Sequence, residues 1–152
     1  MAEILNPDKL LATIGPFPPL ARVFLATAGT LQTTLSAYFG SPVVVEVTSQ
    51  ELSADGTFAR EVDLLRSDVR EVVVRARATV EVDRDDVRSL IVGNQHGLGQ
   101  ILIMLDIPAT FELEEVGEDH GTLWRRYRLR GDGVTYTITE IFPRTAYSAL
   151  HR

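Results

Sequence analysis

The sequence predicts an α+β fold in which helices pack on one face of a mainly antiparallel sheet. Apolar residues recur first at helical spacing and then, beyond residue 40, mostly at every second position, which is typical of half-buried strands. The expected strands form two groups of three with helices between the groups, whereas a parallel sheet requires strands and helices to alternate. The 152 residues show no internal repeat or long linker, so we expect a single domain over residues 1–152.

Helical periodicity dominates the first 40 residues. The proline pair at 18 and 19 suits a first helical turn, and Thr30 can cap a following helix that ends at Gly40. In the middle of the chain, we expect Asp83 to cap one helix and Gly97 to precede another. The apolar faces of these four helices are formed by Leu20, Val23, Phe24, Leu31, Leu35, Tyr38, Phe39, Val87, Leu90, Ile91, Leu98, Ile101, Leu102 and Leu105.

Segments rich in valine, threonine, isoleucine and aromatic residues predict six strands. These segments are residues 43–48, 58–66, 71–82, 110–116, 123–130 and 134–142. Glycine-containing turn signals stand at 54–56 and 131–133, and the second is expected to join the last two strands as a hairpin.

The composition excludes several kinds of site. The chain has no cysteine, so thiolate nucleophiles, disulfides and iron–sulfur clusters are excluded. The three histidines, His96, His120 and His151, are far apart in the sequence, and we expect no metal site. The glycine-rich nucleotide signatures and the GxSxG serine motif are missing as well.

The charge balance argues against nucleic acid as a partner. The formal net charge is -6, from 21 acidic and 15 basic side chains, whereas nucleic-acid binders need a basic surface. The dense arginine run at 125–130 divides between the two faces of its strand. The first residues do not resemble a signal peptide, and no apolar stretch is long enough to cross a bilayer. We therefore expect a cytoplasmic protein without a membrane span.

Two charged residues fall on apolar strand faces. Arg60 shares its face with Phe58 and Val62, and Glu140 shares its face with Ile138. A lone buried charge is destabilising by several kcal/mol, so each residue needs a partner or a polar ligand. One interpretation is a structural Arg60–Glu140 ion pair, or an arginine head that reaches water. The other is a pocket in which Arg60 binds a carboxylate through two parallel hydrogen bonds and Glu140 accepts a hydrogen bond or moves a proton.

Two other features bear on this pocket. Arg125 shares its face with Leu123 and Tyr127, which makes it a further candidate for an inward-facing charge, although for the arginine cluster as a whole we favour a solvated strand face with the arginine stems over Trp124. The glycine-rich run at 93–99 leads into a helix, where backbone N–H groups could approach an anion. Most glycines at such a place are only turn residues, so this signal is weak by itself.

Several short segments carry a family resemblance. Residues 123–130 contain two adjacent arginines on a strand, and Thr-Glu-Ile-Phe-Pro follows at 139–143. An Arg-Glu-Val strand lies at 60–62, a Gly-Leu-Gly helix start at 97–99, and Gly-Thr-Leu-Gln at 29–32. In their order and spacing these segments resemble the chorismate pyruvate-lyase family, whose members cleave chorismate to 4-hydroxybenzoate and pyruvate.

The resemblance implies an enzyme, a lyase with an antiparallel sheet whose helices cover an internal ligand site. It assigns Arg60 and the backbone N–H of Leu98 to the ring carboxylate. It places Glu140 at the ring position that becomes the phenol, so that Arg60 and Glu140 are the expected catalytic residues, and it places Leu31 against the ligand as part of a lid. It also implies that no metal and no organic cofactor is used.

The sequence departs from the family in details that affect the substrate more than the fold. Gly97 stands where the family often has proline, and Leu31 where a methionine can occur. Thr30 and Arg125 are additional candidates for the site. Two other functions therefore stay open. One is a lyase or cyclase acting on another carboxylated molecule, and the other is a non-catalytic small-molecule-binding domain related to the effector domains of transcription regulators.

Overall fold

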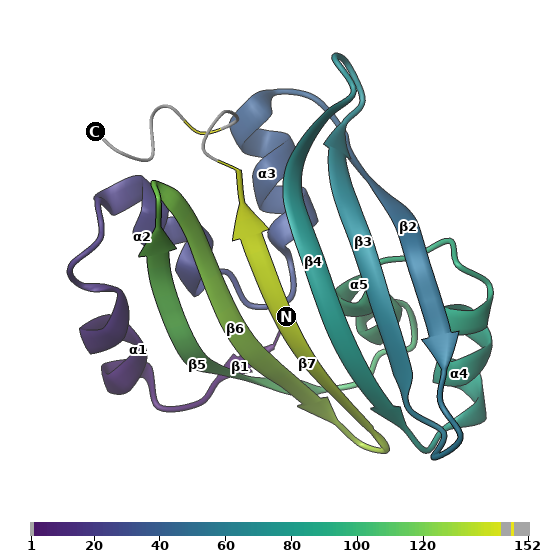
Figure 1. The fold of residues 1–152 in the computed structure, drawn as a ribbon. Coiled ribbons are helices and arrows are strands. Elements are labelled where there is room, and N and C mark those ends of the chain that lie inside the picture. Colours follow the sequence, from purple (N-terminus) through teal and green to yellow (C-terminus); the bar gives the residue numbers. More distant parts are fainter. Residues whose placement is uncertain (1, 144–146, 148–152) are drawn as a thin grey trace.

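A computed structural model describes residues 2–143 and residue 147. The described residues form an α+β fold of five helices and seven strands (Figure 1). The helices are α1 (Pro7–Ile14), α2 (Pro19–Ala26), α3 (Leu31–Phe39), α4 (Asp85–Val92) and α5 (Leu98–Met104). The strands are β1 (Glu3–Ile4), β2 (Val43–Leu52), β3 (Phe58–Arg66), β4 (Glu71–Val82), β5 (Ala109–Asp119), β6 (Thr122–Gly131) and β7 (Val134–Phe142).

One sheet joins all seven strands in the order β1-β5-β6-β7-β4-β3-β2. Every pair is antiparallel except β1 with β5. The prediction of a mainly antiparallel sheet is therefore confirmed, and all six predicted strands are present. The seventh, β1, has two residues, which is too short to show a period of two in the sequence.

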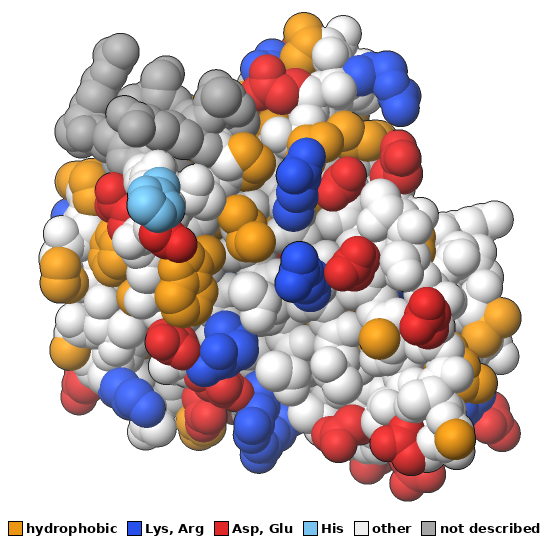
Figure 2. Space-filling view, viewed as in Figure 1, with side chains coloured by type: hydrophobic (Ala, Val, Ile, Leu, Met, Phe, Trp, Pro, Cys, Tyr) orange, Lys and Arg blue, Asp and Glu red, His pale blue; other side chains and the backbone are white. Residues whose placement is uncertain are grey.

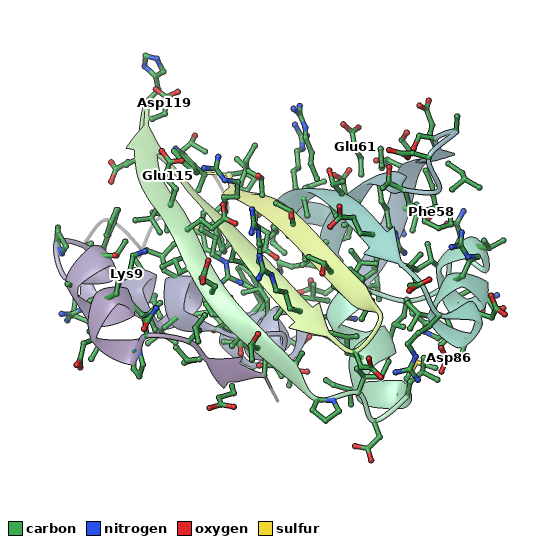
Figure 3. All side chains as sticks on the ribbon, turned by 90° about the horizontal axis from the view of Figure 1, so that it is seen from below. Lys9, Phe58, Glu61, Asp86, Glu115 and Asp119 are labelled. Atoms are coloured by element: carbon green, nitrogen blue, oxygen red, sulfur yellow. The ribbon has the colours of Figure 1, made fainter. Side chains whose placement is uncertain are left out.

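The two faces of the sheet differ in character. The helices lie on one side of it (Figure 1), and the strand residues on that side are buried, as the strict alternation along β7 shows. On the other face, arginines pair with acidic residues across strands, as in Arg77–Glu61 at 3.4 Å and Arg126–Glu115 at 2.6 Å. Charged side chains of both signs therefore lie side by side on this outer face (Figure 2), and Glu61 and Glu115 project from the sheet away from the helices (Figure 3).

Helix starts were predicted less well than helix positions. The helix over 85–92 follows Arg84 as its N-terminal flanking residue, so the prediction that Asp83 caps it is wrong. Thr30 does precede α3, but its side chain makes no capping hydrogen bond. Gly40 ends α3 in the left-handed conformation, as predicted, because glycine adopts a φ of 64° without steric cost. The predicted hairpin is also present, since Gly131 pairs with Val134 across a two-residue turn.

Aromatic packing holds the N-terminal helices on the sheet. The ring of Phe24 from α2 lies 6.2 Å from that of Phe142 on β7 and 5.8 Å from that of Tyr147. The hydroxyl of Tyr147 donates a hydrogen bond to the carbonyl of Val73 on β4. Among the residues that the structure describes, no helix has the length and apolar character needed to cross a membrane.

Candidate functional site

Arg60 and Glu140 line one cavity between the sheet and the helices. Its volume is about 90 Å³, several times the roughly 10–15 Å³ that a single water molecule requires. Apart from these two charges the lining is mostly apolar. It also includes Gly29, Leu31, Gln32, Val45, Val62, Leu64, Ala76, Ala78, Gly97, Leu98, Gly99, Tyr127, Leu129 and Ile138.

Two alanines on β4 open the cavity. The β4 strand lies between β3, which carries Arg60, and β7, which carries Glu140. In the register, Ala78 is opposite Arg60 and Ala76 is opposite Glu140. The inward positions on either side of this pair are valines, so small side chains stand only between the two charges. Neighbouring strands keep a separation of about 4.8 Å whatever their side chains. The small side chains of Ala76 and Ala78 therefore leave space on the helix side of the sheet.

The guanidinium of Arg60 is buried and largely unpaired. The side chain is 2% exposed, and Nη2 donates a hydrogen bond to the carbonyl of His96 at 2.6 Å. Nε and Nη1 have no hydrogen-bond partner among the described residues. Burial lowers the pKa of Arg60 from its ordinary value, but an arginine stays charged at neutral pH. The cavity therefore contains a cation with two free donors.

The predicted alternative of a direct Arg60–Glu140 ion pair is wrong. Glu140 is paired with Arg125 instead, whose Nε lies 2.6 Å from Oε1 of Glu140. The hydroxyl of Tyr127 donates to the other oxygen, Oε2, at 2.9 Å. Arg125, which the sequence indicated only as a candidate for an inward-facing charge, does face inward, since its side chain is fully buried. Each oxygen of the Glu140 carboxylate thus accepts one hydrogen bond within the protein.

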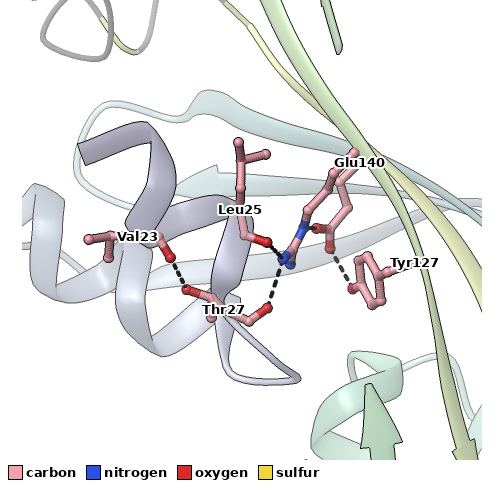
Figure 4. A network of polar contacts seen from close by, with 6 residues as sticks. Val23, Leu25, Thr27, Tyr127 and Glu140 are labelled. Atoms are coloured by element: carbon pink, nitrogen blue, oxygen red, sulfur yellow. Dashed lines mark hydrogen bonds and ion pairs between the residues drawn. The ribbon is translucent and has the colours of Figure 1, made fainter. Parts of the chain in front are cut away.

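Arg125 also connects the sheet to the end of α2, through the main-chain carbonyls of Leu25 and Thr27, which are labelled in Figure 4. Its Nη1 donates to the carbonyl of Leu25 at 2.9 Å and to the carbonyl of Thr27 at 2.8 Å. Its guanidinium lies over the Tyr127 ring, 4.4 Å from the centroid, which adds a cation–π attraction. Backbone carbonyls at a helix C-terminus carry partial negative charge, so a buried cation is well placed there.

Tyr127 is held in its neutral form. Burial raises the pKa of Tyr127 well above its ordinary value, and the neighbouring negative charge of Glu140 raises it further. The hydroxyl therefore remains a hydrogen-bond donor to the carboxylate over the whole physiological pH range.

Two backbone segments close the cavity on the side opposite the sheet. Gly29 and Leu31 come from the connection between α2 and α3, and Gly97 and Leu98 come from the start of α5. The segments meet where a Cβ on Gly99 would lie 2.6 Å from the carbonyl oxygen of Gly29, so only glycine fits there. Leu31 and Leu98 thus line the cavity, whereas Thr30 is not among the lining residues, and the ligand contacts that the resemblance implies for Leu31 and Leu98 stay predictions.

The sequence did not identify several residues that shape this site. Tyr127 was recognised only as an inward-facing neighbour of Arg125, and the pairing of Arg125 with Glu140 was not predicted. The pair Ala76 and Ala78, in an inward row otherwise made of valines, was a signal that could have located the cavity. His96 contacts Arg60 only through its main-chain carbonyl. Because every residue has such a carbonyl, the residue type gave no signal for this contact.

In the part of the chain that the structure describes, no three histidine or acidic side chains gather in a way that could hold a metal ion. The fold and site define an α+β protein with a buried arginine and a buried carboxylate facing one small cavity. Neither a scan against models of protein families nor a search of curated proteins finds a match to this chain. A function must therefore be inferred from the site itself.

Proposed function

We propose that this protein is a lyase that converts chorismate to 4-hydroxybenzoate and pyruvate. The observation that carries the proposal is the buried guanidinium of Arg60, which lines a mostly apolar cavity and whose Nε and Nη1 have no hydrogen-bond partner among the described residues. A guanidinium with unpaired donors in a low-dielectric site forms strong, charge-assisted hydrogen bonds to a carboxylate. Apolar side chains around it, among them Val62, Leu129 and Ile138, suit the faces of a six-membered ring.

In this proposal the two charged residues bind opposite ends of the substrate. Arg60 holds the ring carboxylate, and the Leu98 amide is the second anchor that the resemblance implies. Glu140, on the far side of the two alanines, accepts a hydrogen bond from the ring hydroxyl. The apolar lining keeps the ring between them, and this positioning is the main contribution that an aromatising elimination needs from the protein.

The reaction is balanced without a cofactor. The bond between the ring carbon and the enolpyruvyl oxygen breaks, and the proton leaves the ring carbon that carries the hydroxyl. The departing enolate takes up a proton to give pyruvate, and the ring becomes aromatic. Because both oxygens of Glu140 already accept hydrogen bonds from Arg125 and Tyr127, we assign Glu140 to orienting the hydroxyl through a remaining lone pair.

Incubation of the purified protein with chorismate tests this proposal. We expect the ultraviolet absorbance of 4-hydroxybenzoate and an equal amount of pyruvate to appear together. The activity is expected to survive exhaustive treatment with a chelator, because the chain has no cysteine and no paired histidines. Release of pyruvate without the aromatic product, or the absence of both, would contradict the proposal.

One observation favours a second candidate, a carboxylate-binding domain without catalysis. Glu140 is the only carboxylate that lines the cavity within the described part of the chain, and its two oxygens are both engaged. A site without a free base can bind a ring carboxylate and leave it unchanged. Binding of 4-hydroxybenzoate with no turnover of chorismate would favour this candidate over the lyase.

A further inference from the structure

A buried hydroxyl without a hydrogen-bond partner in the described part of the chain lies on the sheet next to the Arg60 end of the cavity. The side chain of Tyr136 on β7 is fully buried, and its hydroxyl has no hydrogen-bond partner among the residues that the structure describes. A buried hydroxyl without a partner is destabilising, and phenylalanine would fill the same space without that cost. The hydroxyl therefore requires an explanation.

The sheet register places Tyr136 close to Arg60. Arg60 is opposite Ala78 on β4, and Ala78 is opposite Ile138 on β7, so these three residues form one inward row. Tyr136 follows in the next inward row of β7, opposite Val80. The small side chain of Ala78 leaves room between the two long side chains, which rise from the same face of the sheet.

The electrostatics agree with this placement. Burial raises the pKa of Tyr136 above its ordinary value, and the positive charge of Arg60 partly opposes that rise. The phenol is therefore neutral, and its proton is available for donation. Tyr136 does not itself line the cavity, but it adjoins Leu129 and Ile138, which do. Its hydroxyl is thus suited to contact the anion bound by Arg60 and not the ring of the ligand.

We propose that Tyr136 is a second side chain that binds the ligand's carboxylate, acting together with the guanidinium of Arg60. A carboxylate has about four lone-pair positions, which is enough to accept from the phenol and from the guanidinium together. In the ligand-bound state the Tyr136 hydroxyl would then have a hydrogen-bond partner. This inference rests on the proposed function for the identity of the ligand, a ring carboxylate, but not on turnover.

Calorimetric titration of the whole chain with 4-hydroxybenzoate and with 4-hydroxybenzamide tests the inference. For Tyr136→Phe we expect the affinity for the carboxylate to fall about 10- to 100-fold, as loss of a hydrogen bond to a charged group implies. The affinity for the neutral amide is expected to change far less. Because the substitution removes an unpaired polar group, the melting temperature of the free protein is expected to stay the same or rise.

Tyr127→Phe is the matched control. It also removes one buried hydroxyl, but the one that donates to Glu140 at the other end of the cavity. We expect it to change the affinities for the carboxylate and the amide by the same factor. In addition, Tyr136→Phe is expected to have little further effect once Arg60 has been replaced by methionine, because both residues then act on the same bound group.

The outcomes separate this inference from the proposed lyase function. Equal affinity of wild type and Tyr136→Phe for 4-hydroxybenzoate would overturn the role of Tyr136 and leave the lyase proposal intact. Carboxylate binding that depends on Tyr136, without conversion of chorismate, would support the role and contradict the lyase. If the wild type binds neither compound, the inference is overturned together with the carboxylate site.

Discussion

The two ends of the cavity differ in how completely their buried charges are paired within the protein. At the Glu140 end, the carboxylate accepts hydrogen bonds from Arg125 and Tyr127, and Arg125 also donates to two carbonyls at the end of α2, so that only its Nη2 lacks a partner among the described residues. At the Arg60 end, Nη2 donates to a main-chain carbonyl, and both Nε and Nη1 lack a partner in the described part of the chain. A buried charge that has an oppositely charged partner within the protein stabilises the fold. A buried charge without such a partner favours binding of an oppositely charged ligand. We therefore expect the first end to contribute mainly to folding and the second, under the proposed function, to ligand binding.

This difference follows from the polarity of the surroundings. Both ends are removed from water, where an ion pair or a hydrogen bond is stronger and an unsatisfied group more destabilising than at the surface. The negative charge of Glu140 has its partners, Arg125 and Tyr127, within the protein, and they are present with or without a ligand. Among the described residues, the positive charge of Arg60 has only a main-chain carbonyl as its partner. An anion that binds beside it would therefore form hydrogen bonds with the nitrogens that these residues leave unpaired.

The largest expected effect concerns stability at the Glu140 end. Arg125→Met leaves Glu140 as a buried charge without its cation, and we expect the free energy of unfolding to fall by about 3–5 kcal/mol. Arg60→Met is the matched control, since it removes a buried cation of the same size that has no acidic partner. Urea denaturation of both variants measures the difference. Equal destabilisation by the two substitutions would contradict the division between the ends.

Ligand affinity is expected to show the reverse pattern. Arg60→Ala removes the carboxylate's main partner, and binding of 4-hydroxybenzoate is expected to weaken by about 2–5 kcal/mol. Arg60→Lys should restore only part of this loss, because an ammonium cannot form two parallel hydrogen bonds to one carboxylate. Calorimetric titration gives both values. Wild-type affinity in folded Arg60→Ala would rule out Arg60 as the anchor.

The substitution Glu140→Gln keeps the shape of the side chain but removes its negative charge, so it shows which of the two the reaction needs. The amide keeps the shape of the side chain, so product affinity is expected to remain within a few-fold of wild type. Turnover is expected to fall about 100-fold, because the hydroxyl is no longer held by a carboxylate fixed between Arg125 and Tyr127. Steady-state kinetics at low temperature, with circular dichroism to confirm folding, test this. Near-wild-type turnover would remove Glu140 from the reaction.

Filling the space between the two ends tests the role of β4. Ala78→Leu places a larger side chain between Arg60 and Glu140, and we expect ligand binding to be lost while the free energy of unfolding changes by about 1–3 kcal/mol. Ala59→Leu is the control, because Ala59 is the next residue to Arg60 on β3 but is exposed on the outer face. Retained binding in Ala78→Leu would show that the ligand lies elsewhere.

The smallest effect is expected at a site remote from both ends. In the turn after β2, hydrogen bonds from Ser53 and Thr57 lower the pKa of Asp55 from 3.8 to about 2. Since the folded-state pKa is depressed, Asp55 stabilises the fold above about pH 4, and this contribution is lost as the pH falls to about 2. Asp55→Asn is expected to remove that part of the pH dependence. Acid titration of the melting temperature measures it, and an unchanged profile would contradict the assignment.

The fold was predictable because its signals are local. The six long strands followed from a period of two, and Gly40 and the turn at 131–133 followed from the conformational freedom of glycine. The inward direction of Arg60 and Glu140 followed from the same alternation, with Arg125 as a further candidate. The start of α4 was not predictable from Asp83, since capping depends on backbone geometry that a favourable residue type does not determine.

The sequence by itself therefore determined that Arg60 and Glu140 face the interior, and it indicated Arg125 as a candidate. Only the tertiary structure decided which of these charges pair. Arg125 and Glu140 are neighbours across β6 and β7, whereas β4 separates Arg60 from Glu140. Strand order depends on contacts between residues far apart in the chain, and alternation within one strand carries no information about its neighbours. For the same reason only the assembled sheet shows that Ala76 and Ala78 lie between the charges and that Nε and Nη1 of Arg60 have no partner among the described residues.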